Sequence, residues 1–326
     1  MIDRWERNID YVRISVTEKC NLNCIYCSPR GDHLIDSSKE ELSFEELIRL
    51  CKIFINLGIN KFKITGGEPL LKSGLVHFIQ TLKNFPSKPI VTLTTNGILL
   101  NKYLEGLYSA KIDAINISLD TLKEKNYEKI SNKNFLKLLL ENIHKALEYP
   151  DIRLKINSVI LKGYNDDEII SLAELAQNFK IDVRYIEIMP IGHGKNFDLI
   201  PQDKIKNTLE EYFGKSEKII EKIGNGPSKY IKFSHFKGLI GFISAITHEF
   251  CQECNRIRLT SDGYLKGCLQ YTTAINLKKL LIENYDDKNI KEIVANLIYN
   301  KPKHHQFSLD NSIEKKEIKS MIKIGG

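Results

Sequence analysis

Six of the seven cysteines lie in two tight groups, and the first group has the spacing of a metal ligand set. Cys20, Cys24 and Cys27 stand in the run Cys-Asn-Leu-Asn-Cys-Ile-Tyr-Cys. One loop with three thiolates can hold an iron–sulfur cubane and leave one iron without a protein ligand, which implies that a small molecule binds there. Structural zinc takes four closed ligands, and the nearest histidine, His33, is displaced from the usual pairing. The spacing therefore favours an iron–sulfur cluster over zinc.

The second group, Cys251, Cys254 and Cys268, is again a set of three thiols without an obvious fourth ligand. His248 stands three residues before Cys251 and could complete a Cys₃His zinc site, so the spacing alone leaves zinc and an iron–sulfur cluster both open. The remaining cysteine, Cys51, lies on the apolar stripe of a predicted helix, where a buried and inert thiol is usual. We expect no chemistry from it.

The run Gly66-Gly67-Glu68-Pro69 follows a predicted strand and is a third candidate. Two glycines let the backbone approach a ligand closely, and Glu68 can accept a hydrogen bond from an ammonium group. An ordinary tight turn between a strand and a helix would have the same composition. The run indicates a ligand site only in combination with the cysteine group that precedes it.

The elements that must position these residues alternate between apolar strands and amphipathic helices. Such alternation predicts a parallel α/β fold, and the lack of a Gly-rich dinucleotide motif favours a partial (β/α)₆ TIM-type barrel, whose active site lies at the carboxyl ends of the strands. A helix is expected from Ser43, which forms a capping box with Glu46, to Gly58. The predicted strands are 11–17, 61–65, 90–95, 114–119, 153–160 and 183–188, and the other predicted helices are 74–85, 99–109, 134–148 and 167–178.

The pattern changes after Pro190, which predicts two parts, 1–190 and a smaller α+β region over 191–326 that carries the second cysteine group. That region is expected to hold a helix over 202–213, antiparallel strands near 218–223, 229–233 and 239–246, and two terminal helices before a polar tail.

Composition sets the broad class. The 326 residues include 48 Lys and Arg against 41 Asp and Glu, a formal charge of +7 that suits an anionic substrate. No run of about 20 apolar residues and no signal-peptide core is present in the sequence. We therefore expect a cytoplasmic protein without a membrane partner, and reduced cysteines that serve metal binding or catalysis.

The cysteine spacing, with Tyr26 directly before the last thiol and the Gly-Gly-Glu-Pro run one βα unit later, resembles the radical S-adenosylmethionine superfamily. In that superfamily the open iron chelates the methionine amino and carboxylate groups. The run Gly66–Pro69 corresponds to the segment that holds the amino group of S-adenosylmethionine in that superfamily.

The flanks of the second group resemble one family in particular, the molybdenum cofactor biosynthesis protein A family of GTP 3′,8-cyclases. The matching residues are Phe250, Cys254-Asn255-Arg256-Ile257-Arg258-Leu259-Thr260, Asp262-Gly263 and Gly267-Cys268-Leu269. Further matching stretches lie at 11–17, 93–97, 116–120, 155–157, 186–190 and 238–244 and at the terminal Gly325-Gly326, so that the resemblance covers nearly the whole chain.

The resemblance implies two [4Fe-4S] clusters, one on each cysteine group, together with S-adenosylmethionine and GTP. It assigns S-adenosylmethionine to Tyr26, Gly66, Gly67, Glu68, Ser118 and Met189. It assigns GTP to Arg13, Lys63, Thr94, Lys155, Arg256 and Arg258. It also implies that Gly325 and Gly326 insert into the active site and serve catalysis with Arg13, Arg256 and Arg258.

The residues give independent support for the substrate side of this assignment. Arg153, Lys155 and Asn157 share one face of a strand that should be buried on both sides, an expensive place for charge unless the face lines a cavity. Arg256 and Arg258 share a face in the same way. A triphosphate needs such a cationic lining because the sequence has no Walker-type loop. Two positions depart from the family, since Lys63 replaces the usual Arg and Ser28 a frequent Met.

The activity implied is the first step of molybdenum cofactor (molybdopterin) biosynthesis, a lyase reaction that converts GTP to (8S)-3′,8-cyclo-7,8-dihydroguanosine 5′-triphosphate. A 5′-deoxyadenosyl radical would remove hydrogen from the ribose 3′ carbon, which then attacks guanine C8. The implied partners are a reducing electron donor and a downstream cyclic pyranopterin monophosphate synthase, and a homodimer is possible.

Two other functions fit parts of the sequence. A radical S-adenosylmethionine enzyme that acts on a peptide could also carry extra C-terminal clusters, and it would bind no GTP. A zinc-stapled nucleic-acid-binding protein would need basic residues on an exposed helix or beside aromatic stacking platforms, and the sequence has neither arrangement. We therefore expect no nucleic-acid partner.

Overall fold

The six strands expected in the first half of the chain form the centre of one curved sheet. The computed structural model describes residues 1–29, 40–221, 223–307, 317 and 319–324. Neighbouring strands from β1 to β6 pair in chain order, and every pair is parallel. The parallel α/β class is thereby confirmed. The strands are β1 (Tyr11–Ser15), β2 (Lys61–Thr65), β3 (Ile90–Thr95), β4 (Ala114–Ser118), β5 (Arg153–Ile160) and β6 (Asp182–Glu187).

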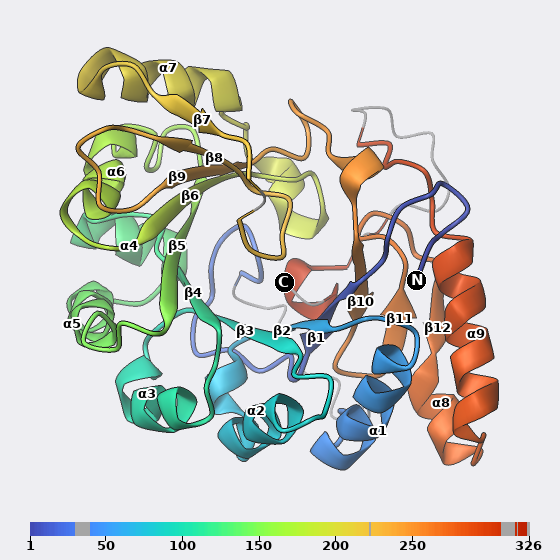
Figure 1. Ribbon diagram of the computed structural model, residues 1–326. Coiled ribbons are helices and arrows are strands. Elements are labelled where there is room, and N and C mark those ends of the chain that lie inside the picture. Colours follow the sequence, from blue (N-terminus) through green and yellow to red (C-terminus); the bar gives the residue numbers. More distant parts are fainter. Residues whose placement is uncertain (30–39, 222, 308–316, 318, 325–326) are drawn as a thin grey trace.

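The helices that connect these strands lie on the outer side of the arc (Figure 1). Ser43 caps the first helix as expected, because its Oγ accepts from the Glu46 amide at 3.1 Å while the Glu46 carboxylate accepts from the Ser43 amide at 2.7 Å. An unexpected short helix, α4, is polar along most of its length and buries only Tyr127, Ile130 and Ser131. The helices are α1 (Phe44–Ile55), α2 (Leu75–Lys83), α3 (Leu100–Ser109), α4 (Glu124–Ser131), α5 (Leu136–Ala146) and α6 (Ile169–Asn178).

The C-terminal part of the chain extends the same sheet at both edges. β9 (Ile240–Ile243) adds in parallel to β6, and β10 (Arg256–Leu259) adds in parallel to β1. The parallel part of the sheet therefore exceeds the six strands expected. The antiparallel pairing expected near 218–246 is present between β7 (Glu217–Ile219), β8 (Lys229–Lys232) and β9. At the other edge, β11 (Tyr264–Lys266) and β12 (Ala274–Asn276) complete the order β12-β11-β10-β1-β2-β3-β4-β5-β6-β9-β8-β7.

The remaining elements close the two sides of the arc. The helix expected over 202–213 is α7, and the two expected near the end are α8 and α9. Figure 1 shows the last short helix, η4, inside the arc that the sheet forms. In the described part of the chain no helix is long and apolar enough to span a membrane. These elements are α7 (Gln202–Phe213), α8 (Leu277–Ile282), α9 (Asp287–Tyr299), η1 (Pro69–Leu71), η2 (Gly192–Asn196), η3 (Cys251–Glu253) and η4 (Met321–Ile324).

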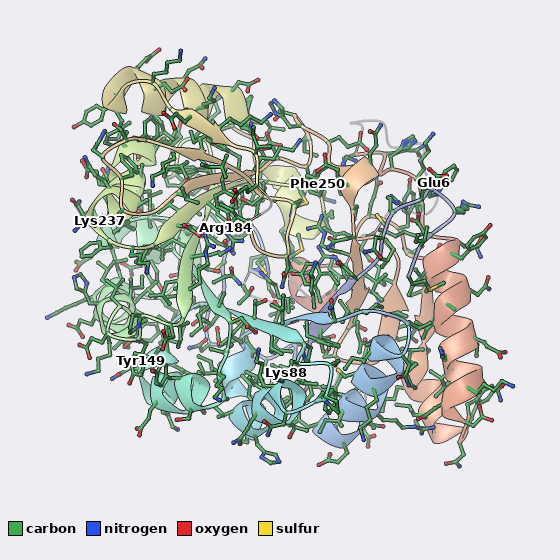
Figure 2. All side chains as sticks on the ribbon, viewed as in Figure 1. Glu6, Lys88, Tyr149, Arg184, Lys237 and Phe250 are labelled. Atoms are coloured by element: carbon green, nitrogen blue, oxygen red, sulfur yellow. The ribbon has the colours of Figure 1, made fainter. Side chains whose placement is uncertain are left out.

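The strands divide their side chains between an apolar outer face and a polar inner face. In β2, Phe62 and Ile64 belong to the hydrophobic core under the helices, whereas Lys63 and Thr65 line an internal cavity. Successive side chains of a strand point to opposite faces, so this alternation follows from the sequence of each strand. Figure 2 shows the consequence for the whole molecule, because Arg184 lies within the arc while Tyr149 and Lys237 lie at its periphery.

Candidate active site

The sheet encloses a cavity of about 330 Å³ that brings the two cysteine groups together. All six grouped cysteines line it, although the two groups come from opposite ends of the chain. The first group follows β1, and the second lies on both sides of β10. Because β1 and β10 are parallel neighbours, the sheet itself sets the distance between the two groups.

The first cysteine loop is held by the Gly-Gly run. The Gly67 amide donates to the Thr17 carbonyl at 2.7 Å, and the Glu68 amide donates to the Lys19 carbonyl at 2.8 Å. A Cβ at Gly67 would lie 2.3 Å from the Lys19 carbonyl oxygen, so only glycine permits this approach. The glycines therefore fix the chain just before Cys20, and they also line the cavity.

The three thiols of the first loop suit an iron–sulfur cluster by their chemistry. Burial raises the pKa of Cys20 to about 11 and that of Cys27 to about 12, so neither thiol ionises at neutral pH without a metal. The Leu22 amide lies 3.5 Å from the Cys20 Sγ as a donor. Such N–H donors to cysteine sulfur are typical of the surroundings of iron–sulfur clusters.

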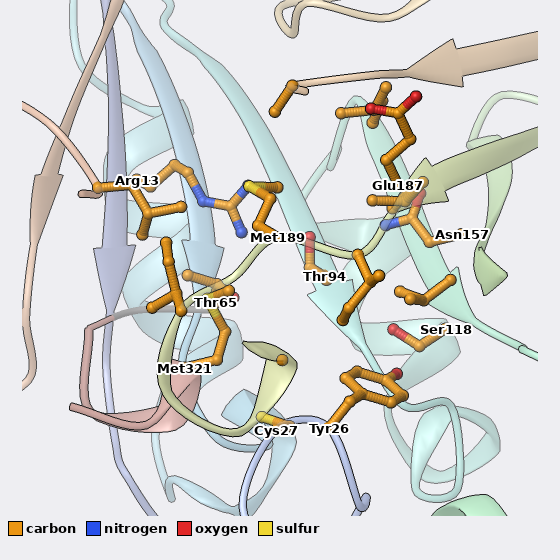
Figure 3. A pocket seen from close by; sticks show the side chains of 18 of the residues that line it. Arg13, Tyr26, Cys27, Thr65, Thr94, Ser118, Asn157, Glu187, Met189 and Met321 are labelled. Atoms are coloured by element: carbon orange, nitrogen blue, oxygen red, sulfur yellow. The ribbon is translucent and has the colours of Figure 1, made fainter. Parts of the chain in front are cut away.

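The residues expected around S-adenosylmethionine divide into two sets. Tyr26, Ser118 and Met189 line the cavity together with Gly66 and Gly67, and Figure 3 shows the first three pointing into it. The Tyr26 hydroxyl donates to the Asp120 carboxylate at 2.7 Å, and burial raises the pKa of Asp120 to about 6. Asp120 also lines the cavity, and the sequence analysis did not identify it.

Glu68 lies behind the residues that line the cavity and holds the loop that carries Gly67. Its carboxylate accepts from the Leu70 amide at 3.0 Å, the Thr95 hydroxyl at 2.7 Å and the Asn96 amide at 2.7 Å. Its side chain is buried and does not line the cavity. These contacts connect the end of β2 to the end of β3, so Glu68 positions residues that do face the cavity.

Three cations lie side by side across the inner face of the sheet. In the strand register Arg13 of β1 is directly opposite Arg258 of β10 on one side and Lys63 of β2 on the other. The pKa of Lys63 is held well below its usual value, chiefly by burial and then by the charges of Arg184 and Arg13. The pKa of Arg258 is lowered in the same way, by burial and then by Arg13 and Arg256. Within the described residues no carboxylate pairs with Lys63. Cations at this spacing repel one another, so a bound anion would stabilise the row.

Unsatisfied polar atoms on the neighbouring strands face the same cavity. The Thr94 Oγ1, the Asn157 Oδ1 and the Arg184 Nε are buried without a hydrogen-bond partner among the described residues. All three residues line the cavity. A ligand that supplies these hydrogen bonds removes a desolvation cost at each atom.

Lys155 is buried on the neighbouring strand but is not among the residues that line the cavity. Its Nζ is 3.3 Å from the Tyr230 hydroxyl, and a Cβ at Gly224 would meet it at 2.9 Å. Burial and the charge of Arg184 lower the pKa of Lys155 to about 7. The lysine is therefore within the influence of the cationic cavity without lining it.

Arg184 is not among the residues predicted for the site from the sequence. It lies in β6 between the core residues Val183 and Tyr185, and its Nη2 donates to the Asn116 Oδ1 at 2.6 Å. The alternation Val-Arg-Tyr is a signal for its position, because successive side chains of a strand point to opposite faces and the arginine is then on the inner face.

The second cysteine group has a more polar setting. Burial alone would raise the pKa of Cys254, but Arg256 and Lys301 lower it to about 6. His248, which could complete a zinc site by its spacing alone, instead approaches Asp203, with 3.5 Å between Nε2 and Oδ1. His305 and Glu249 both lie close to Cys251, and the His305 amide donates to the Cys251 Sγ at 3.3 Å. Three thiols with cations and an N–H donor beside them fit an anionic cluster.

The end of the described chain reaches both cysteine groups. The Glu317 amide donates to the carbonyl of Gln270, two residues after Cys268, at 2.6 Å. Met321 lines the cavity, and the Ile322 amide lies near the Cys27 thiol. The predicted insertion of Gly325 and Gly326 falls outside the described residues, as does His33.

Comparisons with known proteins identify the family of the chain. Residues 14–176 match the model of the Radical SAM superfamily, and residues 181–307 match that of Molybdenum Cofactor Synthesis C. The chain is 40% identical over 331 residues to the GTP 3′,8-cyclase of Clostridium perfringens (strain SM101 / Type A) and 41% identical over 332 residues to that of Syntrophomonas wolfei, with 100% of both chains covered in each case.

A solved structure supports the fold. Streptococcus suis SuiB, crystallised with S-adenosylmethionine, superposes with a TM-score of 0.63 at 16% identity over 88% of this chain and 68% of that one. The two family models and the full-length similarity together show that the chain belongs to the GTP 3′,8-cyclase family of the radical SAM superfamily.

Proposed function

We propose that this protein is a GTP 3′,8-cyclase that converts GTP to (8S)-3′,8-cyclo-7,8-dihydroguanosine 5′-triphosphate, the first step of molybdenum cofactor biosynthesis. The observation that carries the proposal is the row of Arg258, Arg13 and Lys63 between two groups of three thiols. A row of buried cations suits a triphosphate, and two open three-thiolate sites suit two clusters that each bind a ligand.

Cys20, Cys24 and Cys27 hold the first [4Fe-4S] cluster, and Tyr26, Gly66, Gly67, Ser118 and Met189 surround S-adenosylmethionine. The cluster and S-adenosylmethionine, when bound, supply the one-electron chemistry that breaks the ribose C–H bond. Glu68 keeps the loop that carries Gly67 in place through its three donors. The protein's part at this end is to bind and orient.

Cys251, Cys254 and Cys268 hold the second [4Fe-4S] cluster, next to which the guanine base lies. The triphosphate lies on Arg13, Lys63, Arg256 and Arg258. Thr94 and Arg184 complete its hydrogen bonds through atoms that are buried and unsatisfied without it. Lys155, whose Nζ contacts the Tyr230 hydroxyl, adds positive charge beside the site.

Exclusion of water is the task of the C-terminal segment. Ile322 and Ile324 are buried, and Met321 lines the cavity beside the first cysteine loop. A radical intermediate survives only where solvent is excluded, so a well-packed segment at this place protects the reaction. The catalytic role that the family resemblance implies for Gly325 and Gly326 concerns residues outside those that the structure describes.

The proposal also covers the two parts of the chain, the cellular location and the partners. Residues 1–190 form the radical SAM part, and residues 191–326 carry the second cluster and a GTP site to which Arg13, Lys63, Thr94 and Lys155 of the first part also contribute. The enzyme works in the cytoplasm, where reducing conditions keep cysteine thiols available as cluster ligands. A reducing electron donor serves the first cluster, a separate cyclic pyranopterin monophosphate synthase takes the product, and two copies of the chain form a homodimer.

The direct test is an anaerobic assay of the protein reconstituted with iron and sulfide. It is incubated with S-adenosylmethionine, dithionite and GTP, and the products are identified by mass spectrometry. We expect 5′-deoxyadenosine together with an isomer of GTP of unchanged mass. Cys24→Ala and Cys268→Ala should each abolish the isomer, whereas Cys51→Ala, which changes a buried thiol of α1, should retain it.

Formation of 5′-deoxyadenosine with unmodified GTP would contradict the cyclase activity and leave the radical chemistry intact. A peptide substrate would then be the next candidate. A colourless protein with stoichiometric zinc after anaerobic isolation would contradict both readings of the cysteines.

A further inference from the structure

Lys301 is a buried cation that the proposed function leaves without a role. It follows α9, is 3% exposed and lines the cavity. Its Nζ donates to the Gly267 carbonyl at 2.5 Å, and within the described residues no carboxylate pairs with it. A buried ammonium that has only a carbonyl partner carries a large desolvation cost, so an anion must lie near it in the loaded protein.

The position of Lys301 identifies that anion. Gly267 directly precedes Cys268, and the charge of Lys301 also acts on Cys254. A cluster with three thiolate ligands carries net negative charge and becomes more negative when it is reduced. Among the groups proposed for this cavity, the second cluster is the one whose ligands surround the lysine.

The N-terminal segment fixes the lysine relative to the same cysteines. The Trp5 indole Nε1 donates to the Lys301 carbonyl at 2.9 Å. The Arg7 guanidinium donates to the Pro302 carbonyl at 2.7 Å and to the Cys251 carbonyl at 2.9 Å. A buried ion pair with Asp3, 2.6 Å long, holds the guanidinium itself. One arginine thus ties the chain beside Lys301 to the loop that carries Cys251.

We infer that Lys301 is a positioning charge for the second cluster that raises its reduction potential. This inference rests on the proposed assignment of Cys251, Cys254 and Cys268 to that cluster. A fixed positive charge in a site of low dielectric stabilises the more negative, reduced state over the oxidised one. The lysine thereby makes the second cluster easier to reduce and need not contact the reacting atoms.

The test measures the potential directly, without GTP or S-adenosylmethionine. The full chain and the variants Lys301→Met, Lys301→Arg and Lys303→Met are reconstituted anaerobically, and iron and acid-labile sulfide are counted. The two clusters are then followed through a redox titration by electron paramagnetic resonance, with Cys24→Ala to identify the signal of the second cluster. Lys303, two residues after Lys301, is the matched control, because its side chain is exposed and its ammonium lies over the Trp5 ring.

We expect Lys301→Met to move the midpoint potential of the second cluster to a more negative value while the first cluster stays unchanged. Lys301→Arg and Lys303→Met should remain near the parent. Loss of the second cluster from Lys301→Met alone, with Lys301→Arg still loaded, would equally support a requirement for the charge.

An unchanged potential in Lys301→Met, or loss of the second cluster from both Lys301 variants, would overturn the inference and leave the proposed function standing. A parent chain that takes up only one cluster would overturn the proposed function and this inference together. The two failures are therefore distinguishable by the iron count of the parent.

Discussion

Arg13 and Arg258 lie directly opposite each other on the neighbouring parallel strands β1 and β10, although they come from opposite ends of the chain. Lys63 continues the same row on β2. Side chains at equivalent positions of paired strands stand about 5 Å apart, so the fold holds three like charges together across its inner face. The triphosphate that we propose to bind here would offset this repulsion.

The first prediction concerns Lys63. Lys63→Met should weaken GTP binding about 10- to 100-fold, since a hydrogen bond to a charged group contributes about 1.5–3 kcal/mol. Lys63→Arg should retain binding, because it keeps the charge and adds a fork that suits phosphate. Anaerobic calorimetry of the reconstituted protein measures both.

Guanosine, which lacks the phosphates, separates a phosphate contact from general damage. Its binding should be equal in the parent and in Lys63→Met. Lys102→Met, at an exposed position of α3, is the control and should bind GTP normally. Equal losses for GTP and guanosine would show that Lys63 supports the base or the fold instead.

The second prediction concerns pH. The pKa of Lys155 is lowered to about 7 in the ligand-free protein, by burial and by Arg184, from the usual 10.5. A bound triphosphate favours the charged lysine and raises the pKa of Lys155. At a pH between the pKa of the ligand-free protein and that of the complex, Lys155 therefore takes up a proton when GTP binds. Affinity for GTP should therefore fall as the pH rises above about 7.

Calorimetry at pH 8 in two buffers of different ionisation enthalpy measures the proton directly. The parent should take up a proton on binding, and Lys155→Met should take up less. Lys162→Met, an exposed lysine after the end of β5, serves as the control. Proton uptake that is the same in all three proteins would remove Lys155 from this role.

The third prediction concerns the segment that ends the described chain. Lys266 of β11 and Glu317 form an ion pair whose side chains are each 4% exposed. Removal of one partner of a buried pair costs about 3–5 kcal/mol, so Glu317→Gln should free the segment. Hydrogen exchange at the amides of residues 319–324 should become faster, while the core strands stay protected.

A paired replacement distinguishes charge from shape. Lys266→Met combined with Glu317→Leu should recover much of the protection, because neither charge is then left unpaired. Glu283→Gln, which breaks an exposed pair with Lys279, should change nothing. Unchanged exchange in Glu317→Gln would mean that other contacts hold the segment.

The fourth prediction concerns the glycine that supports the first cysteine loop. Gly67→Ala would bring a Cβ to 2.3 Å from the Lys19 carbonyl oxygen and should displace the loop. Cleavage of S-adenosylmethionine should be lost together with the first cluster. Gly163→Ala is the control, because its φ of +78° makes alanine strained while nothing lies within 4 Å of the new Cβ. That variant should keep both clusters, and a Gly67→Ala protein that does so too would refute the role.

The sequence predicted what depends on local pattern. The six central strands, the Ser43 cap and the cysteine loops all follow from spacing and alternation within a few residues. The pairing of β10 with β1, which brings Arg258 to Arg13, depends on a contact between the two ends of the chain, and no local signal carries it. The contacts of Arg7 and Lys301 could not be predicted for the same reason, because their partners lie far away in the sequence.

The measurement that tests the central claim most directly uses GTP with deuterium at the ribose 3′ carbon. The reconstituted protein is incubated anaerobically with this substrate, S-adenosylmethionine and dithionite, and the 5′-deoxyadenosine is examined by mass spectrometry. The account predicts that deuterium appears in 5′-deoxyadenosine in step with formation of the cyclised product. Unlabelled 5′-deoxyadenosine beside intact GTP would contradict it.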